Sequence, residues 1–201
     1  MLVGPDREKF SLHKDLVCGV SKYFQTAFNI KSERGVEPTI TLEDVDVTHF
    51  KTFADWLYDE DSLEFVLSSH GEEDHFGKIL ALFQLGERFG STTLKQLLVD
   101  RIVSYIKTAR EVHLDFSKVN ELYSKTKAGS GIRRLMVDYI AWEADDKSIE
   151  STCIMDWIPR QPELVGDLLL AYIRSSKSEL PLAEWEKALS SRDYYDTEWS
   201  E

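Results

Sequence analysis

The sequence predicts a predominantly helical α+β protein, with a few short strands beside a cluster of amphipathic helices. Apolar residues recur at helical spacing along most of the chain, as in Phe50, Phe53, Ala54 and Leu57. Short apolar runs bounded by turn residues, typical of strands, occur in the first 70 residues. The chain has 201 residues, of which 42% are hydrophobic, and its mean hydropathy is -0.32. A chain of this size and composition is expected to fold around a hydrophobic core.

The N-terminal residues predict a hairpin followed by two short helices. Leu2-Val3 and Phe10–Leu12 are apolar runs separated by the turn sequence Gly4–Arg7. The apolar period changes from two to helical at Lys14. Ser21 is placed to cap a second helix, because a serine side chain there accepts a backbone N–H.

The middle of the chain predicts alternating strands and helices. A strand at 39–42 precedes a helix that Asp46 caps, and a further short strand is expected at 63–67. A buried central helix ends at Gly90, and Thr93 with Gln96 predicts a capping box that opens the next helix. The remaining helices are expected around Val119–Tyr123, Ile132–Ile140, Leu164–Ile173 and Pro181–Leu189.

Composition and charge argue against several classes of protein. No apolar run approaches the roughly 20 residues that span a bilayer, and no signal sequence opens the chain, so we expect a cytoplasmic or nuclear protein. The net charge of -12 disfavours direct nucleic-acid binding, and no Cys/His repeat predicts a zinc finger. Cys18 and Cys153 are read as buried thiols and not as a disulfide.

No residue cluster predicts catalysis, a metal or a cofactor. His13 lies near Cys18, but the cysteine falls on a helix of core type, so we interpret His13 as structural. His70 and His75 flank the acidic residues 72–74 without the spacing of a ligand pair, and this stretch is interpreted as a solvated loop.

Two sequence blocks resemble the BTB/POZ domain, in particular its fungal branch. The first comprises Phe10, His13-Lys14, Ser21, Tyr23-Phe24 and Ala27-Phe28. The second comprises Ile40–Leu42, Asp44–Asp46, Phe50, Phe53 and Trp56–Tyr58. The resemblance covers the first half of the chain and continues more weakly to Trp142. Relatives carry more residues before the first turn, so the first strand is expected to be shortened here.

The resemblance implies a non-enzymatic protein-interaction module that oligomerises and recruits partners. One possible role is a substrate adaptor for a cullin-based ubiquitin ligase. Alternatives are a scaffold or transcriptional co-regulator unconnected with ubiquitin, a monomeric adaptor similar to elongin-C and Skp proteins, and an enzyme whose site has no recognisable spacing. We expect a BTB/POZ domain at 1–110, a helical extension at 111–190 packed on it, and an acidic tail at 191–201.

The resemblance also implies that self-association uses the first strand and the first two helices. The residues expected there are Val3, Phe10, Leu16, Tyr23 and Phe24. The aromatic residues among them fit a core position as well as an interface. Because the first strand is short, the association is expected to be weak or conditional.

The partner-binding surface is expected at the end of the helix that finishes at Tyr58. Residues 59–74 contain seven acidic side chains and no lysine or arginine, a pattern that can steer a basic partner. The residues expected to contact a cullin are Tyr58, Asp59, Glu60, Leu63 and Phe65. The alternative is a solvated loop in which Leu63 and Phe65 turn into the core.

Overall fold

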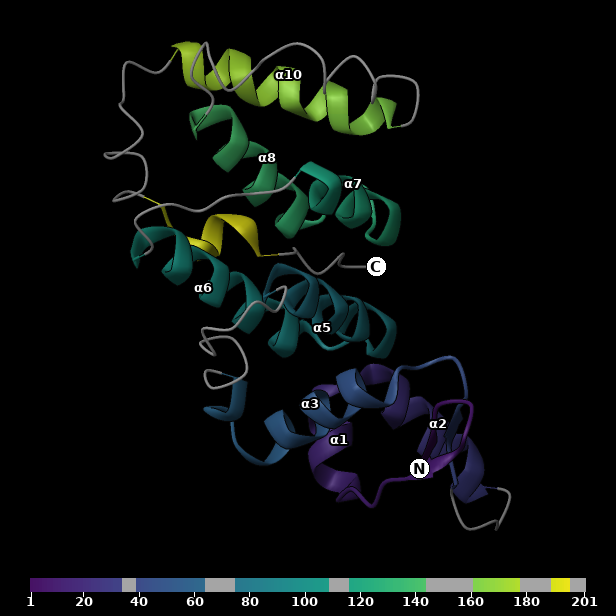
Figure 1. Ribbon diagram of the computed structural model, residues 1–201. Coiled ribbons are helices and arrows are strands. Elements are labelled where there is room, and N and C mark those ends of the chain that lie inside the picture. Colours follow the sequence, from purple (N-terminus) through teal and green to yellow (C-terminus); the bar gives the residue numbers. More distant parts are fainter. Residues whose placement is uncertain (34–38, 64–74, 109–115, 144–160, 178–188, 196–201) are drawn as a thin grey trace. The chain divides into compact units, whose positions relative to one another are not determined.

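The computed structural model describes residues 1–33, 39–63, 75–108, 116–143, 161–177 and 189–195 (Figure 1). The chain divides into two compact units, Met1–Leu98 and Val99–Glu201, which are described separately below. The boundary falls within helix α6 (Thr92–Thr108). Among the described residues, no helix has both the length and the apolarity needed to span a membrane.

The first unit contains a small three-stranded sheet. Strand β1 (Leu2–Val3) lies in the middle, antiparallel to β2 (Glu8–Lys9) and parallel to β3 (Thr41–Leu42). The predicted hairpin is therefore confirmed, but its second strand is Glu8–Lys9 and not Phe10–Leu12. The Phe10 N–H donates to the Met1 carbonyl at 2.9 Å. Phe10 and the two residues after it are not part of a strand.

Helices complete the first unit around an aromatic core. They are α1 (Lys14–Val20), α2 (Lys22–Glu33), α3 (Val47–Tyr58), α5 (His75–Phe89) and the first part of α6. The Phe89 side chain is fully buried, and its ring lies 4.8 Å from that of Phe24 and 5.1 Å from that of Phe53. Phe50 and Trp56 are also buried. This core holds α2, α3 and α5 together, and the predicted α+β class is confirmed.

Two predicted helix caps are present. The Ser21 hydroxyl accepts the Phe24 N–H at 3.2 Å and donates to the Phe89 carbonyl at 2.6 Å. Ser21 therefore caps α2 and also ties it to the end of α5. Asp46 caps α3, because its carboxylate accepts the His49 N–H at 2.9 Å.

The junction between α5 and α6 differs from the predicted capping box. Gly90 has φ +61°, its N–H donates to the Glu87 carbonyl, and the Ser91 N–H donates to the Gly86 carbonyl. This is a Schellman motif, which ends α5 as expected from Gly90. The same Ser91 then caps α6 through the Leu94 N–H at 3.4 Å. The Thr93–Gln96 prediction is wrong because the Schellman turn starts α6 at Thr92.

The strand predicted at 63–67 is wrong at its first residue. Ser62 and Leu63 are helical, and residues 64–67 lie outside the described part of the chain. The continuous apolar character of this run fits a buried strand and a buried helical turn equally, and periodicity alone does not separate the two.

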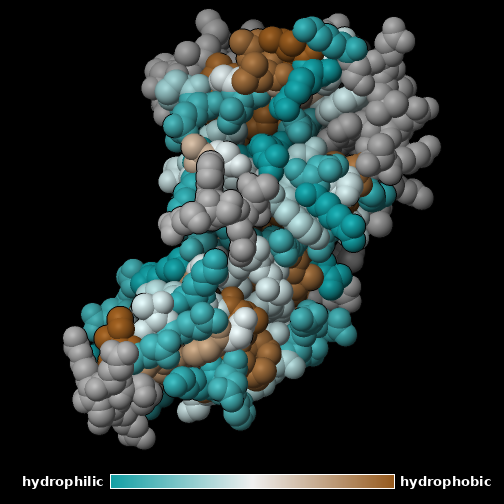
Figure 2. All heavy atoms as spheres, turned by 180° about the vertical axis from the view of Figure 1, so that it is seen from behind, coloured by the Kyte–Doolittle hydropathy of each residue, from teal (hydrophilic) through white to brown (hydrophobic). Residues whose placement is uncertain are grey.

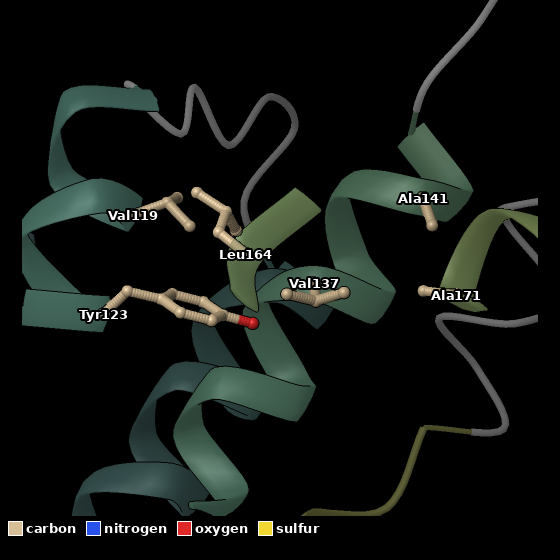
Figure 3. Close-up of a cluster of buried hydrophobic side chains, with 6 residues drawn as sticks. All are labelled: Val119, Tyr123, Val137, Ala141, Leu164 and Ala171. Carbon is tan, nitrogen blue, oxygen red and sulfur yellow. The ribbon is translucent and has the colours of Figure 1, made fainter. Parts of the chain in front are cut away.

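The second unit is built from helices. They are the rest of α6, α7 (Phe116–Lys125), α8 (Gly131–Glu143), α10 (Pro162–Lys177) and the 3-10 turn η1 (Ser191–Tyr194). A buried cluster joins α7, α8 and α10 (Figure 3). Its members are Val119, Tyr123, Val137, Ala141, Leu164 and Ala171. The helix predicted at Pro181–Leu189 falls largely outside the described residues.

The turn η1 packs on α8 through one buried tyrosine. The Tyr194 hydroxyl donates to the Asp138 carboxylate at 3.1 Å. Burial raises the pKa of both groups, and for Tyr194 the charge on Asp138 raises the pKa further. Arg174 of α10 pairs with the same carboxylate at 3.0 Å, so Asp138 links α8, α10 and η1.

Candidate protein-interaction sites

The start of α1 and the end of α3 are joined by one polar contact. The Tyr58 hydroxyl accepts the His13 N–H at 3.0 Å and lies 2.9 Å from His13 Nδ1. His13 is the N-cap residue of α1, but its own side chain makes no capping bond. The contact therefore fixes the start of α1 through the tip of α3. These contacts support the interpretation of His13 as a structural residue.

The C-terminal end of α3 carries only negative charge. Asp55, Asp59, Glu60 and Asp61 are exposed, and no basic residue lies in the last turn. Two hydrogen bonds hold the turn: the Asp59 N–H donates to the Asp55 carbonyl, and the Asp61 N–H donates to the side-chain carboxylate of Asp59. Helix C-termini carry a partial negative charge of their own, so these carboxylates add to an unfavourable local potential. A cationic partner would relieve it.

The residues predicted for partner binding do not all reach this surface. Tyr58 is 51% exposed, and Asp59 and Glu60 are exposed beside it. Leu63 is 0% exposed, so its prediction as an apolar anchor is wrong and the alternative core position holds. Phe65 lies outside the described residues.

The residues predicted for self-association also separate into two groups. Val3 and Phe24 are both 0% exposed, because β1 is the central strand and Phe24 packs on Phe89. We therefore remove them from the self-association surface. Phe10 is half-buried, with its ring 5.0 Å from that of Phe50. Its main contact is thus within the unit.

Leu16 and Tyr23 remain available to a partner. Leu16 is 42% exposed and lies on α1, a seven-residue helix whose single buried residue is Val17. Tyr23 is 36% exposed, although one side of its ring contacts Phe24 and Phe89. These two side chains place exposed apolar surface on neighbouring helices.

The sequence analysis missed one residue of this surface. Ile30 is 47% exposed and lies seven residues after Tyr23, with the half-buried Ala27 between them. Residues at this spacing share one face of a helix, so the spacing itself was the available signal. We call Leu16, Tyr23, Ala27 and Ile30 the α1–α2 face.

The described residues offer no metal-binding cluster of three or more His, Cys, Asp or Glu side chains. Cys18 is half-buried, and burial raises the pKa of its thiol, which disfavours the reactive thiolate. Its backbone carbonyl accepts a hydrogen bond from Gln25 at 2.6 Å. His70, the other candidate ligand, lies outside the described part.

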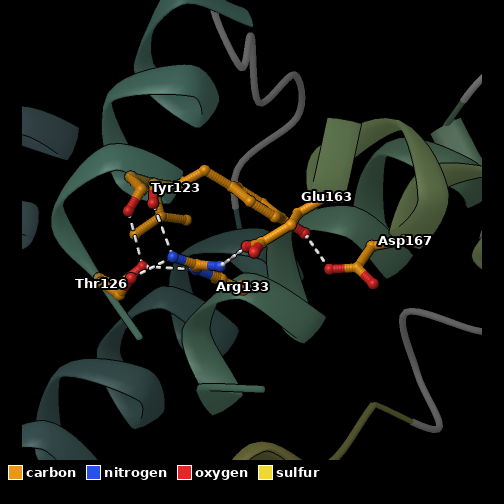
Figure 4. A network of polar contacts seen from close by, with 6 residues as sticks. Tyr123, Thr126, Arg133, Glu163 and Asp167 are labelled. Atoms are coloured by element: carbon orange, nitrogen blue, oxygen red, sulfur yellow. Dashed lines mark hydrogen bonds and ion pairs between the residues drawn. The ribbon is translucent and has the colours of Figure 1, made fainter. Parts of the chain in front are cut away.

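The second unit contains a buried arginine that the sequence analysis did not identify. Arg133 is 4% exposed, and its guanidinium donates to the carbonyls of Tyr123 and Thr126 and to the Thr126 hydroxyl (Figure 4). It also pairs with Glu163 at 3.0 Å and stacks 4.4 Å from the centre of the Tyr123 ring. Tyr123 in turn donates to Asp167 at 2.8 Å. These contacts connect α7, α8 and α10, so we assign the network a structural role.

Comparison with known proteins agrees with the geometry of the first unit. A family profile described as the BTB/POZ domain matches residues 1–104, just over half of the chain. Neither a search of curated proteins nor a search of solved structures found a match.

Proposed function

Because the chain belongs to the BTB/POZ domain family, whose members are non-catalytic protein-interaction modules, we propose that its first unit binds a second copy through the α1–α2 face. The observation that carries this proposal is the state of α1. This helix has seven residues and buries one side chain, Val17, while Leu16 stays largely exposed. Helices this short depend on tertiary packing for their stability, so burial of Leu16 against a second copy would stabilise α1 further.

The outer side of α2 extends the same surface. Tyr23 and Ile30 lie on one stripe of the helix, and both are more than one-third exposed. A two-fold contact would use this stripe twice, since each copy presents the same residues to the other. Tyrosine and isoleucine also suit an interface that must bury apolar area without buried charge.

Co-purification of two differently tagged copies tests this proposal. When both copies carry Tyr23→Ser, less of the second copy is expected to be recovered with the first, because the substitution removes an aromatic side chain from the α1–α2 face. Tyr105→Ser is the matched control, since Tyr105 is 52% exposed on α6 and lies outside the face. Equal recovery of the second copy by both variants and the parent would contradict the proposal.

The acidic end of α3 supports a second function, the recruitment of a cullin scaffold as an adaptor of a ubiquitin ligase. Tyr58 offers a half-exposed aromatic ring beside Asp59 and Glu60, which attract a basic surface. A scaffold or co-regulator unconnected with ubiquitin would keep self-association and bind no cullin.

A pull-down with a cullin N-terminal domain separates these roles. The double variant Asp59→Lys/Glu60→Lys reverses the charge without removing the Tyr58–His13 contact, and is expected to lose binding. The control Asp6→Lys/Glu8→Lys makes the same charge change in the exposed hairpin. Tyr58→Ala is a poorer test, because it also leaves the His13 N–H without its acceptor. No cullin binding by the parent protein would rule out the adaptor role.

A further inference from the structure

Polar contacts hold helix α1 at both of its ends. At the start, the His13 N–H donates to the Tyr58 hydroxyl at 3.0 Å, and the rings of the two residues lie 5.6 Å apart. At the end, the Gln25 side chain of α2 donates to the Cys18 carbonyl at 2.6 Å. Between the two ends, α1 buries the side chain of Val17. The position of α1 therefore depends on both ends as well as on this apolar contact.

The start of α1 lacks a side-chain cap of its own. His13 occupies the N-cap position with extended backbone, and its side chain makes no capping bond to the first turn. Its Nδ1 instead lies 2.9 Å from the Tyr58 hydroxyl, which also accepts its backbone N–H. A serine or an aspartate at this position would cap the helix without help from another element. Here a tyrosine from the end of α3 fixes the residue that precedes α1.

Tyr58 lies outside the α1–α2 face, yet its hydroxyl supports one part of that face. Leu16 follows His13 by three residues, so the two lie within one turn of α1, and Leu16 is 42% exposed. A shift of the backbone at His13 therefore moves Leu16. The Tyr58 ring itself is 51% exposed beside the acidic residues that end α3. One side chain thus belongs to the acidic surface and also sets the place of Leu16.

We propose that Tyr58 is a positioning residue for self-association, whose hydroxyl holds α1 where Leu16 meets a second copy. This inference rests on the function proposed for the α1–α2 face. Removal of the hydroxyl keeps the aromatic ring and the acidic surface but frees the start of α1. Association must then order α1 at a cost in conformational entropy, so the second copy binds more weakly.

Hydrogen exchange of the α1 amides tests the hydroxyl without requiring association. The measurement uses the full chain in the Tyr23→Ser background, in which self-association is weakened. Tyr58→Phe is expected to speed α1 exchange by about threefold or more, because one hydrogen bond at the helix start is lost. Tyr172→Phe is the matched control, since Tyr172 is 42% exposed on α10, over which Figure 2 shows hydrophobic surface. Equal α1 exchange in the two Tyr→Phe variants overturns the proposal.

A rescue variant separates positioning of α1 from a general loss of stability. His13→Ser supplies a hydroxyl that can accept an N–H of the first turn of α1. Added to Tyr58→Phe, it is expected to restore the slow exchange of α1. A double variant that exchanges as fast as Tyr58→Phe alone would show that the order of α1 is not what the hydroxyl controls, and would overturn the proposal.

Sedimentation equilibrium, with Tyr23 intact, connects α1 to self-association. Tyr58→Phe is expected to raise the dissociation constant of the two copies about fivefold, and His13→Ser/Tyr58→Phe to return it to the parent value. A dissociation constant that Tyr58→Phe leaves unchanged overturns the proposal. A parent chain that does not associate contradicts the function of the α1–α2 face and this proposal with it, and the exchange result then shows separately whether Tyr58 orders α1.

Discussion

Arg133 is the side chain on which the polar interior of the second unit depends. Its guanidinium donates to the carbonyls of Tyr123, in the last turn of α7, and of Thr126, just after the helix, and its ion-pair partner Glu163 is 66% exposed. Arg133→Met is expected to lower the free energy of unfolding by roughly 2–4 kcal/mol, because buried carbonyls lose their donors. Urea unfolding measures this loss. Arg134→Ala, on the exposed side of the same helix, is the control and should cost at most about 0.5 kcal/mol.

The Asp44–Arg88 pair predicts a change of stability with pH. The guanidinium donates to both carboxylate oxygens, at 2.6 and 2.7 Å, and holds the pKa of Asp44 below its usual 3.8. A carboxyl group with a lowered folded-state pKa stabilises the fold above its unfolded pKa and loses that effect as the pH falls through the folded value. The coupling between Asp44→Asn and Arg88→Gln should therefore be measurable near neutral pH and disappear in acid.

A double-mutant cycle in urea, repeated across this pH range, checks the Asp44 prediction. A coupling that stays constant with pH, or grows as the pH falls, would show that the carboxylate is not the group involved. The carboxylate of Asp44 is exposed to water, so the coupling is also expected to weaken as salt is added.

Gly131 is required where η1 returns to α8. A Cβ at this position would overlap the carbonyl oxygen of Tyr194, so the two backbones are in direct contact. Gly131→Ala is expected to destabilise the chain by at least about 2 kcal/mol, although alanine is the better helix former. Gly166→Ala is the control, because an added Cβ there meets no atom within 4 Å, and it should stabilise the chain. Gly129→Ala is less suitable, because the φ of +74° at Gly129 strains any other residue. A higher melting temperature for Gly131→Ala would contradict this contact.

The sequence predicted correctly those helix ends that are determined by residues close to them in the chain. Ser21, Asp46 and Gly90 act within a few residues of themselves, so their sequence context was sufficient to place three helix ends. The apolar run that begins at Leu63 was assigned to a strand, because its side chains give no period that separates strand from helix. The second hairpin strand was predicted too late in the chain, at Phe10–Leu12 and not at Glu8–Lys9. The apolar residues of a strand do not show which residues of the neighbouring strand pair with it.

The sequence did not predict which of the candidate interaction residues are exposed. Tyr23 and Phe24 are adjacent aromatic residues, and only packing against Phe89 decides that Phe24 is buried while Tyr23 keeps one side free. Arg133 was missed because a single arginine among apolar residues was not interpreted, although it lies four residues before the buried Val137. Tertiary contacts determine both outcomes.

The two units share helix α6, which predicts how the chain responds to proteases. Leu94 and Leu98 are buried in the part of α6 that belongs to the first unit, and Ile102 and Ile106 are buried in the part that belongs to the second. Cleavage between 106 and 115 leaves the first fragment with exposed Ile102 and Ile106. We therefore predict that limited proteolysis releases no pair of stable fragments that unfold separately and cooperatively. Two such fragments, found by calorimetry after cleavage, would show independent domains.

The central claim is that this BTB/POZ protein associates with itself through the α1–α2 face, and sedimentation equilibrium over a range of concentrations tests it most directly. The experiment compares the full parent chain with its Leu16→Glu variant. We predict that the average mass of the first protein rises with concentration, whereas the second remains at the 23.2 kDa of one chain. A single-chain mass for both proteins at all concentrations, or the same increase in both, would contradict the claim.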